Sequence, residues 1–221
     1  MSELNFYSPE EVKPLYGEIV PVYQEAFKIE PWNSATKCVD AQSPVRCKDG
    51  YSPLETGELC VTCEACPIRP AFEYDELAST FDTLAESRPT TWYLERSGGK
   101  LAVAMLAWKA VSETITAEKY DKVPEMKDWV QGKVGGKPIG WLDEVFANRL
   151  VRSEGNLDNF VEACTGMATR LDIVRLAFRT INPKMLSVAE RFGERTQIFE
   201  PKTGAPDWRS FVVIDVEGVK Q

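Results

Sequence analysis

The N-terminal part of the chain carries apolar residues at the three- and four-residue spacing of an amphipathic helix. Ser8 suits the N-cap of this helix, and Glu11 completes a capping box with it. Because Pro14 and Pro21 interrupt the pattern, we expect two helical pieces or a kink. The same apolar spacing returns over residues 75–87 and predicts another helix.

From residue 91 onward the pattern becomes that of strands. Apolar runs at 91–95 and 101–110 flank a Gly-Gly turn and predict a β-hairpin. The polar stretch 111–136 predicts one helix. Strands alternating with helices predict an α/β or α+β fold, with a mixed central β-sheet flanked by helices. The remaining expected elements are a strand at 138–147, a helix at 155–170, a strand at 173–181, a helix at 183–192, and strands at 197–200 and 210–216.

A segment without clear apolar periodicity separates the first two helices. Residues 34–70 are rich in proline and glycine and hold five of the six cysteines, whereas Cys164 stands alone in a predicted helix. A long irregular segment inside a compact domain needs something to order it. We therefore expect a single domain over residues 1–221 with a small Cys-rich insertion at 34–70.

The spacing of the cysteines in this insertion suggests a metal site. Two cysteines two residues apart can bind one tetrahedral ion, and a more distant pair completes the site. The chain has no histidine, so a structural Zn²⁺ would be held by four thiolates. Cys47, Cys60 and Cys63 are the first choice, with either Cys38 or Cys66 as the fourth ligand. An iron–sulfur cluster stays open as the alternative, because Cys60, Cys63 and Cys66 match part of a ferredoxin-like run.

Charge and composition exclude several classes of function. The 221 residues include 26 basic and 34 acidic side chains, a net charge of −8. This balance argues against a nucleic-acid or anionic-membrane partner and suits a cationic amine substrate. The absence of histidine excludes His-based acid–base catalysis and His-containing triads. No signal-peptide pattern and no membrane-spanning apolar run is present, so we expect a cytoplasmic protein.

The loop after the strand at 138–147 has the features of an anion site. Backbone N–H groups at the start of the next helix, expected near Gly155, lack intrahelical partners and suit a pyrophosphate. Gly155 allows a ligand to approach the backbone, and Arg152 adds a positive charge. Taken alone, these residues also fit a plain strand–helix connection with a surface arginine.

The segment from Arg152 to Leu157 resembles the coenzyme A pyrophosphate loop of the GNAT superfamily of N-acetyltransferases, in which Arg/Gln-x-x-Gly-x-Gly/Ala follows a strand. The strand at 174–178, the helix that begins at Asn182, and the early segment 23–32 also resemble GNAT elements. The resemblance implies acetyl-CoA as acyl donor and a small-molecule or protein amine as acceptor. The residues that it implies at coenzyme A are Val145, Phe146, Ala147, Arg152, Ser153, Glu154, Gly155, Asn156, Leu157 and Asn182.

Acetyl transfer to an amine needs a neutral amine, a polarised carbonyl and a protonated leaving thiolate. Without histidine, the base must be a carboxylate, acting directly or through water. Glu144 is the best candidate because it lies near the end of its strand, and strand alternation predicts that Asp143 points to the opposite face. Either carboxylate also fits an ordinary solvated or ion-paired position. Tyr93, Glu95 and Trp108 could line the substrate side or be ordinary sheet residues.

Two positions depart from the family pattern. Leu157 replaces a small residue, so its side chain either crowds the pyrophosphate or turns into the core. The helix after Asn182 lacks the tyrosine with which many family members protonate the thiolate. These departures favour an alternative function, that of an inactive GNAT-like binding module that recruits a protein partner through the insertion. A homodimer is also possible from the sequence. The spacing of Arg152 and Gly155 favours the enzyme.

Overall fold

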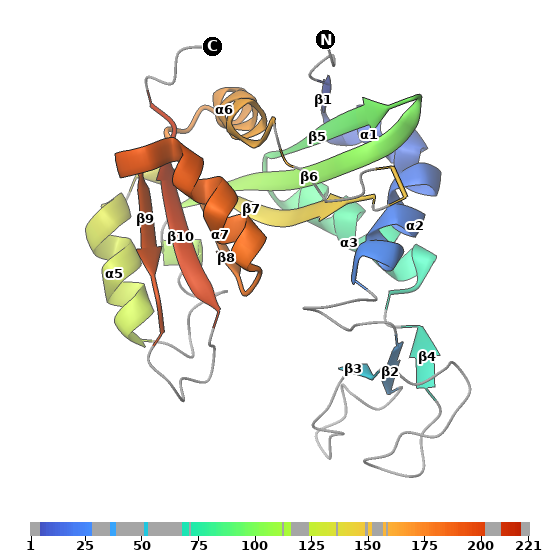
Figure 1. Cartoon of the computed structure of the whole chain (residues 1–221), viewed down its shortest axis with the longest axis horizontal. Helices are drawn as coiled ribbons and strands as arrows, with labels where there is room; N and C mark the ends of the chain where they lie inside the picture. Colours follow the sequence, from blue (N-terminus) through green and yellow to red (C-terminus); the bar gives the residue numbers. More distant parts are fainter. Residues whose placement is uncertain are drawn as a thin grey trace.

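A seven-stranded mixed sheet forms the centre of the chain in its computed structural model (Figure 1). The strand order is β1-β5-β6-β7-β8-β10-β9, and β7 and β8 are the one parallel pair in this sheet. The strands are β1 (Asn5–Tyr7), β5 (Thr90–Ser97), β6 (Lys100–Val111), β7 (Pro138–Ala147), β8 (Arg175–Thr180), β9 (Thr196–Phe199) and β10 (Ser210–Asp215). The structure describes residues 5–27, 36–38, 51–52, 68–70, 72–111, 113–115, 124–135, 137–148, 150–151, 157, 159–201 and 209–217.

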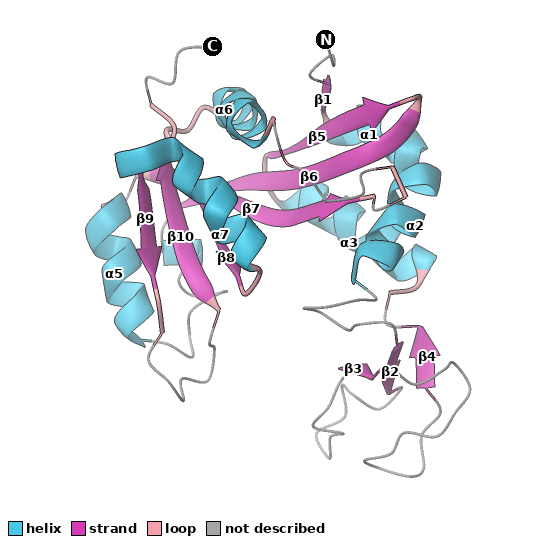
Figure 2. Ribbon diagram, viewed as in Figure 1, coloured by secondary structure: helices cyan, strands magenta, loops and turns pink. Residues whose placement is uncertain are grey.

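Helices cover both faces of the sheet (Figure 2). One face packs against α2 (Tyr16–Phe27), α3 (Tyr74–Ser87) and α5 (Pro124–Val134), and the other packs against α6 (Phe160–Leu171) and α7 (Pro183–Ala189). Strand alternation produces this division, since Tyr93 and Met105 belong to the core under α6 while Trp92 and Leu106 belong to the core under α2 and α3. No helix within the described ranges is long and apolar enough to cross a membrane.

The start of the first helix agrees with its sequence signals. The Ser8 N–H donates to Glu11 Oε2 (2.8 Å) and the Glu11 N–H donates to Ser8 Oγ (3.4 Å), which confirms the capping box. The helix is divided at Pro14, because α1 (Pro9–Val12) passes through a 3₁₀ turn (Lys13–Leu15) into α2. Pro21 lies inside α2 and does not end it.

A small antiparallel sheet lies in the segment between α2 and α3, apart from the central sheet (Figure 1). It consists of β2 (Thr36–Cys38), β3 (Tyr51–Ser52) and β4 (Ile68–Pro70), in the order β3-β2-β4. The sequence did not predict these strands, because two or three residues are too few to establish an alternation. Cys38 ends β2, whereas Cys47, Cys60, Cys63 and Cys66 lie outside the described residues. Among the described residues alone, no cluster of three or more potential metal-ligating side chains occurs.

An ion pair fastens α2 to the β5–β6 hairpin. The Arg96 guanidinium donates to both carboxylate oxygens of Glu18 (2.5 and 2.7 Å), and the Leu101 N–H donates to Glu18 Oε1 (3.0 Å). Gly98 and Gly99 at the turn have φ values of 57° and 78°, the left-handed conformations that a two-residue hairpin turn requires. Three charge-assisted hydrogen bonds at one carboxylate therefore link the helix to the strand ends.

Replacing Glu18 by Gln is expected to lower the free energy of unfolding by about 1 kcal/mol at neutral pH. The Arg96 hydrogen bonds lower the pKa of Glu18 from its ordinary value of 4.5. Because the folded-state pKa is lowered, this stabilisation is complete above the ordinary pKa and is lost as the pH falls through the folded value. Urea unfolding at neutral and acidic pH, with Glu194→Gln at an exposed site as control, measures the difference. An equal loss at both pH values contradicts the ion-pair explanation.

Candidate active site

The parallel strands β7 and β8 pair only at Gly140–Leu176 and Trp141–Ala177. At the pairing point β7 has a glycine, and a Cβ on Gly140 would lie 2.3 Å from Ile173 Cδ1 and 2.6 Å from Leu176 Cδ2. The glycine thus allows the two strands to approach closely at one end. Beyond Trp141 the strands continue without pairing, and the space between them is a pocket.

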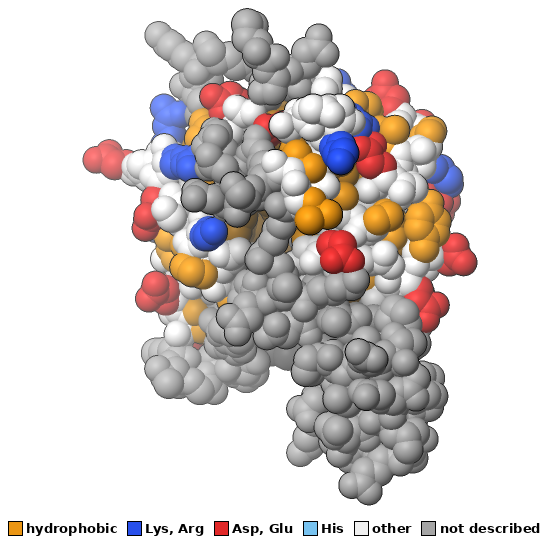
Figure 3. All heavy atoms as spheres, turned by 45° about the vertical axis from the view of Figure 1, so that its right-hand side comes forward, with side chains coloured by type: hydrophobic (Ala, Val, Ile, Leu, Met, Phe, Trp, Pro, Cys, Tyr) orange, Lys and Arg blue, Asp and Glu red, His pale blue; other side chains and the backbone are white. Residues whose placement is uncertain are grey.

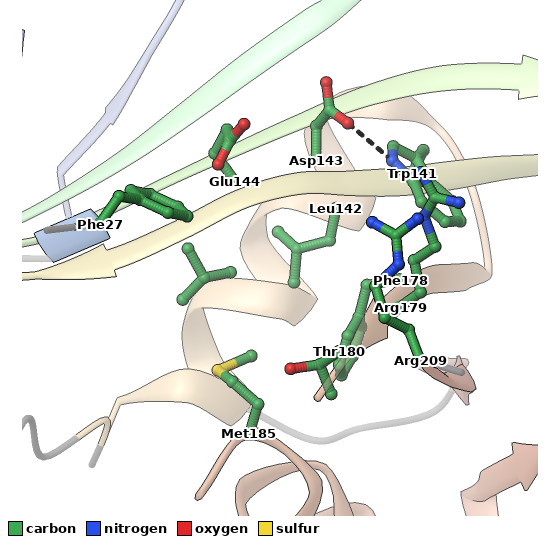
Figure 4. A pocket seen from close by; sticks show the side chains of 11 residues that line it. Phe27, Trp141, Leu142, Asp143, Glu144, Phe178, Arg179, Thr180, Met185 and Arg209 are labelled. Carbon is green, nitrogen blue, oxygen red and sulfur yellow. Dashed lines mark hydrogen bonds between the residues drawn. The ribbon is translucent and has the colours of Figure 1, made fainter. Parts of the chain in front are cut away.

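A β-bulge lies in β7 at the edge of this pocket. Ala107 pairs with Leu142 and Leu106 pairs with Glu144, so Asp143 is an extra residue in β7. Figure 4 shows Asp143 and Glu144 pointing to the same side of β7, with Leu142 pointing to the other. The prediction that Asp143 lies on the face opposite Glu144 is therefore wrong, because the bulge interrupts the alternation on which it rested.

The pocket between the strands has a volume of about 280 Å³ and takes its lining from both faces of the sheet. Leu142, Val145 and Phe178 belong to or pack against the core under α6 and α7, which gives one end an apolar lining. Asp143 and Glu144 give the other end polar groups. The full set of lining residues is Phe27, Trp141, Leu142, Asp143, Glu144, Val145, Phe178, Arg179, Thr180, Met185 and Arg209.

Helix α2 holds the carboxylate of Glu144 in place. The Tyr23 hydroxyl donates to Glu144 Oε1 at 3.0 Å, across 121 positions of the chain. Tyr23 is itself 5% exposed, and its ring stacks on Phe27 with centroids 4.4 Å apart and meets Phe146 edge-on. A buried and tightly packed donor therefore fixes the half-buried carboxylate at the pocket. Sequence reasoning missed Tyr23, because helical spacing marks it only as a core residue.

The other carboxylate and the hairpin residues have different surroundings. Asp143 Oδ1 accepts a hydrogen bond from Trp141 Nε1 at 2.8 Å, shown as a dashed line in Figure 4. Tyr93 and Glu95 are buried and hydrogen-bonded to each other at 3.1 Å, and Trp108 is buried beneath the Arg88 guanidinium. These three hairpin residues do not line the pocket. Of the carboxylates considered from the sequence, Asp143 and Glu144 reach it.

The residues expected at coenzyme A are divided between described and undescribed parts of the chain. Val145, Phe146 and Ala147 are the last three residues of β7, and Val145 lines the pocket. Asn182 caps α7, since its side chain accepts the Lys184 N–H at 3.0 Å. Arg152, Ser153, Glu154, Gly155 and Asn156 lie outside the described residues.

The structure decides between the two orientations that the sequence left open for the Leu157 side chain. Its side chain is 8% exposed and belongs to the core with Phe160, so it turns inward rather than toward the loop. The Phe160 N–H donates to the Leu157 carbonyl at 3.0 Å, and the Arg191 guanidinium donates to the same carbonyl at 2.9 Å. Helix α6 begins at Phe160, and the predicted start near Gly155 is wrong, because the chain first makes a turn that buries Leu157.

Helix α7 contributes Met185 to the pocket and contains no tyrosine. The side chain of Met185 is half-buried at the apolar end, near Thr180 of β8 (Figure 4). The group with which many GNAT enzymes protonate the leaving thiolate therefore has no counterpart in this helix.

Comparison with known proteins supports the fold. No protein-family model and no curated protein sequence matches the chain. Among solved structures, histone acetyltransferase HPA2 and related acetyltransferase from Corynebacterium glutamicum matches with a TM-score of 0.52 at 12% identity, over 97% of each chain. Arylalkylamine N-acetyltransferase 2 from Aedes aegypti matches with a TM-score of 0.50 at 9% identity, over 97% of this chain and 99% of that one. The chain therefore has the GNAT fold, and the predicted fold class is confirmed.

Proposed function

We propose that the protein is an acetyl-CoA-dependent N-acetyltransferase that acts on an amine. The observation that carries this proposal is the pocket between the diverging strands β7 and β8, with the Glu144 carboxylate held at its polar end. Its apolar end suits the acyl-bearing arm of the donor, and its polar end suits the amine. The Aedes aegypti neighbour is an arylalkylamine N-acetyltransferase by name, which agrees with an amine acceptor.

In this proposal Glu144 is the general base. The amine nitrogen attacks the thioester carbon, the carbon–sulfur bond breaks, and the proton lost by the amine passes to the Glu144 carboxylate. Coenzyme A leaves as a thiolate, which solvent protonates because α7 offers no tyrosine. The Tyr23 hydroxyl keeps the carboxylate oriented and is a positioning residue.

We propose that the coenzyme is bound by residues that follow β7. Residues 152–156 belong to the connection between the end of β7 and α6, and they include Arg152 and Gly155 for the pyrophosphate. Val145, Phe146 and Ala147 offer backbone groups along the acyl-bearing arm. The Leu157 side chain is buried in the core, so the leucine at this position does not argue against a pyrophosphate site in the loop.

Replacing Arg152 by Glu is expected to weaken acetyl-CoA binding about 30-fold, because a carboxylate then lies beside the pyrophosphate. Isothermal titration calorimetry with acetyl-CoA measures the dissociation constant of the variant. Arg195→Glu, which makes the same charge change at an exposed site, is the control. Equal affinities of the two variants contradict the assignment of the loop.

A binding module without catalysis is the second candidate function, and the absence of a tyrosine from α7 favours it. Such a module would bind acetyl-CoA and leave it intact. Release of free coenzyme A thiol in the presence of amines distinguishes the two candidates.

We also propose a structural zinc site in the insertion, formed by Cys47, Cys60 and Cys63 with Cys38 or Cys66. Strands of two or three residues are too short to be stable alone, and Cys38 ends the middle strand of the small sheet. A metal ion would supply the missing stability.

Elemental analysis of untagged protein is expected to find about one zinc per chain. Cys60→Ser is expected to release the metal, whereas Cys164→Ala is expected to retain it. Cys164 is a suitable control because burial in α6 raises the pKa of its thiol and keeps it protonated. Zinc-free protein with freely titrating thiols contradicts the site, and iron with visible absorbance replaces it with a cluster.

A further inference from the structure

The pocket is lined by two guanidinium groups in addition to its two carboxylates. Arg179 of β8 pairs in register with Phe211 of β10, and Arg209 precedes Phe211 by two residues. Residues two apart in an extended segment, and residues opposite one another in a pair, share one face of a sheet. Arg179 and Arg209 therefore lie on the face of Phe211, and both line the pocket.

This face is the one to which Glu144 and Asp143 point. Phe211 stacks on Trp141 with centroids 5.9 Å apart, and Trp141 donates its indole N–H to Asp143. Figure 4 shows Arg179 and Arg209 extending toward Trp141, while Met185 lies apart from them. The lining of the pocket thus includes two carboxylates from β7 and two guanidinium groups, with the guanidinium groups beside Trp141 and Glu144 on the side of Phe27 (Figure 4).

The charge balance of the pocket lining differs from that of the whole chain. The net charge of −8 suited a cationic amine, but the two arginines balance the two carboxylates that line the pocket. A guanidinium binds carboxylates in a two-pronged geometry and repels ammonium groups. Both arginines are half-buried, where charge interactions are stronger than in bulk water.

We propose that the amine acceptor also carries a carboxylate, as a free amino acid does, and that Arg179 and Arg209 determine this specificity. The inference rests on the proposed function. The carboxylate of the acceptor binds at the two guanidinium groups, and its amine lies at Glu144. A diamine would place its second ammonium group near the arginines, and an arylalkylamine would place no carboxylate there, so both are disfavoured. The pocket volume of about 280 Å³ fits a small molecule.

Matched pairs of acceptors test the proposal, each pair differing only in the α-carboxylate. Suitable pairs are L-phenylalanine with phenethylamine, L-lysine with cadaverine, and the other common amino acids with their decarboxylated amines. With acetyl-CoA as donor, kcat/KM is expected to be at least about tenfold higher for the amino acid in the preferred pair. Arg209→Gln is expected to lower kcat/KM for that amino acid about 30-fold and to abolish the preference for the amino acid over its amine, whereas Arg195→Gln at an exposed site retains that preference.

Calorimetric titration with the same pairs, without acetyl-CoA, separates this proposal from the proposed function. Tighter binding of an amino acid than of its amine, lost in Arg209→Gln, supports the acid-binding site even in protein that fails to bind acetyl-CoA. The wild-type comparison between paired ligands needs no variant, so a folding defect in Arg209→Gln does not obscure it. Binding or turnover of the amines equal to or better than that of the amino acids overturns the proposal, as does the absence of amino-acid binding at millimolar concentration.

Discussion

Replacing Glu144 by Gln is expected to lower kcat for acetyl transfer about 100- to 1000-fold, the usual contribution of a general base. Glutamine keeps the shape of the side chain, and its carbonyl oxygen can still accept the Tyr23 hydrogen bond. It cannot accept a proton from the amine. Affinity for acetyl-CoA is expected to stay within about twofold of the wild type, because binding of acetyl-CoA does not require the Glu144 carboxylate. Steady-state kinetics and calorimetry measure the two quantities on the same protein.

Asp143→Asn is the matched control for Glu144→Gln. Asp143 lies on the same side of the same bulge, but its carboxylate accepts from Trp141 rather than from Tyr23. Its loss of turnover is expected to be smaller than that of Glu144→Gln. If Asp143→Asn lowers kcat more than Glu144→Gln does, the base is Asp143. If Glu144→Gln turns over as fast as the wild type, Glu144 has no part in proton transfer.

Replacing Met185 by Trp is expected to weaken acetyl-CoA binding about 50-fold or more, because a larger rigid side chain then fills the apolar end of the pocket. Met185 comes from α7 and is half-buried, so the indole can be accommodated without opening the main core. Calorimetry with acetyl-CoA gives the affinity, and thermal unfolding without ligand verifies that the variant is folded.

Met185→Leu is the control for this steric block. It conserves side-chain volume, so affinity is expected to stay close to that of the wild type. Equal acetyl-CoA affinities of Met185→Trp and the wild type contradict the placement of the acyl-bearing arm at this end of the pocket.

Local signals in the sequence predicted most of the central domain. The Ser8 capping box, the Gly98–Gly99 hairpin and the two ends of β7 each depend on residues a few positions apart, and each agrees with the structure. Helix α6 is the exception, because its start depends on the burial of Leu157 in a core assembled from distant segments. Strand β1 escaped prediction because three residues carry no periodicity, and it forms by pairing with β5.

The residues of the candidate site could be predicted only in part from the sequence. Glu144 was found because a strand that enters a polar loop exposes its last residues. Its partner Tyr23 depends on the packing of α2 against β7, and the position of Asp143 depends on a bulge set by the register with β6. Arg179 and Arg209 share one face of the sheet only when β8 pairs with β10, and no spacing along the chain signals that pairing.

The central claim is that the pocket between β7 and β8 binds acetyl-CoA, and thermal unfolding of the wild-type protein with increasing acetyl-CoA tests it most directly. A ligand that binds only the folded state must raise its stability in proportion to the logarithm of ligand concentration. The unfolding temperature is expected to rise continuously with acetyl-CoA in the wild type and in Glu144→Gln, and to rise far less in Met185→Trp. An unfolding temperature that stays constant up to millimolar acetyl-CoA, with no heat of binding by calorimetry, would contradict the claim.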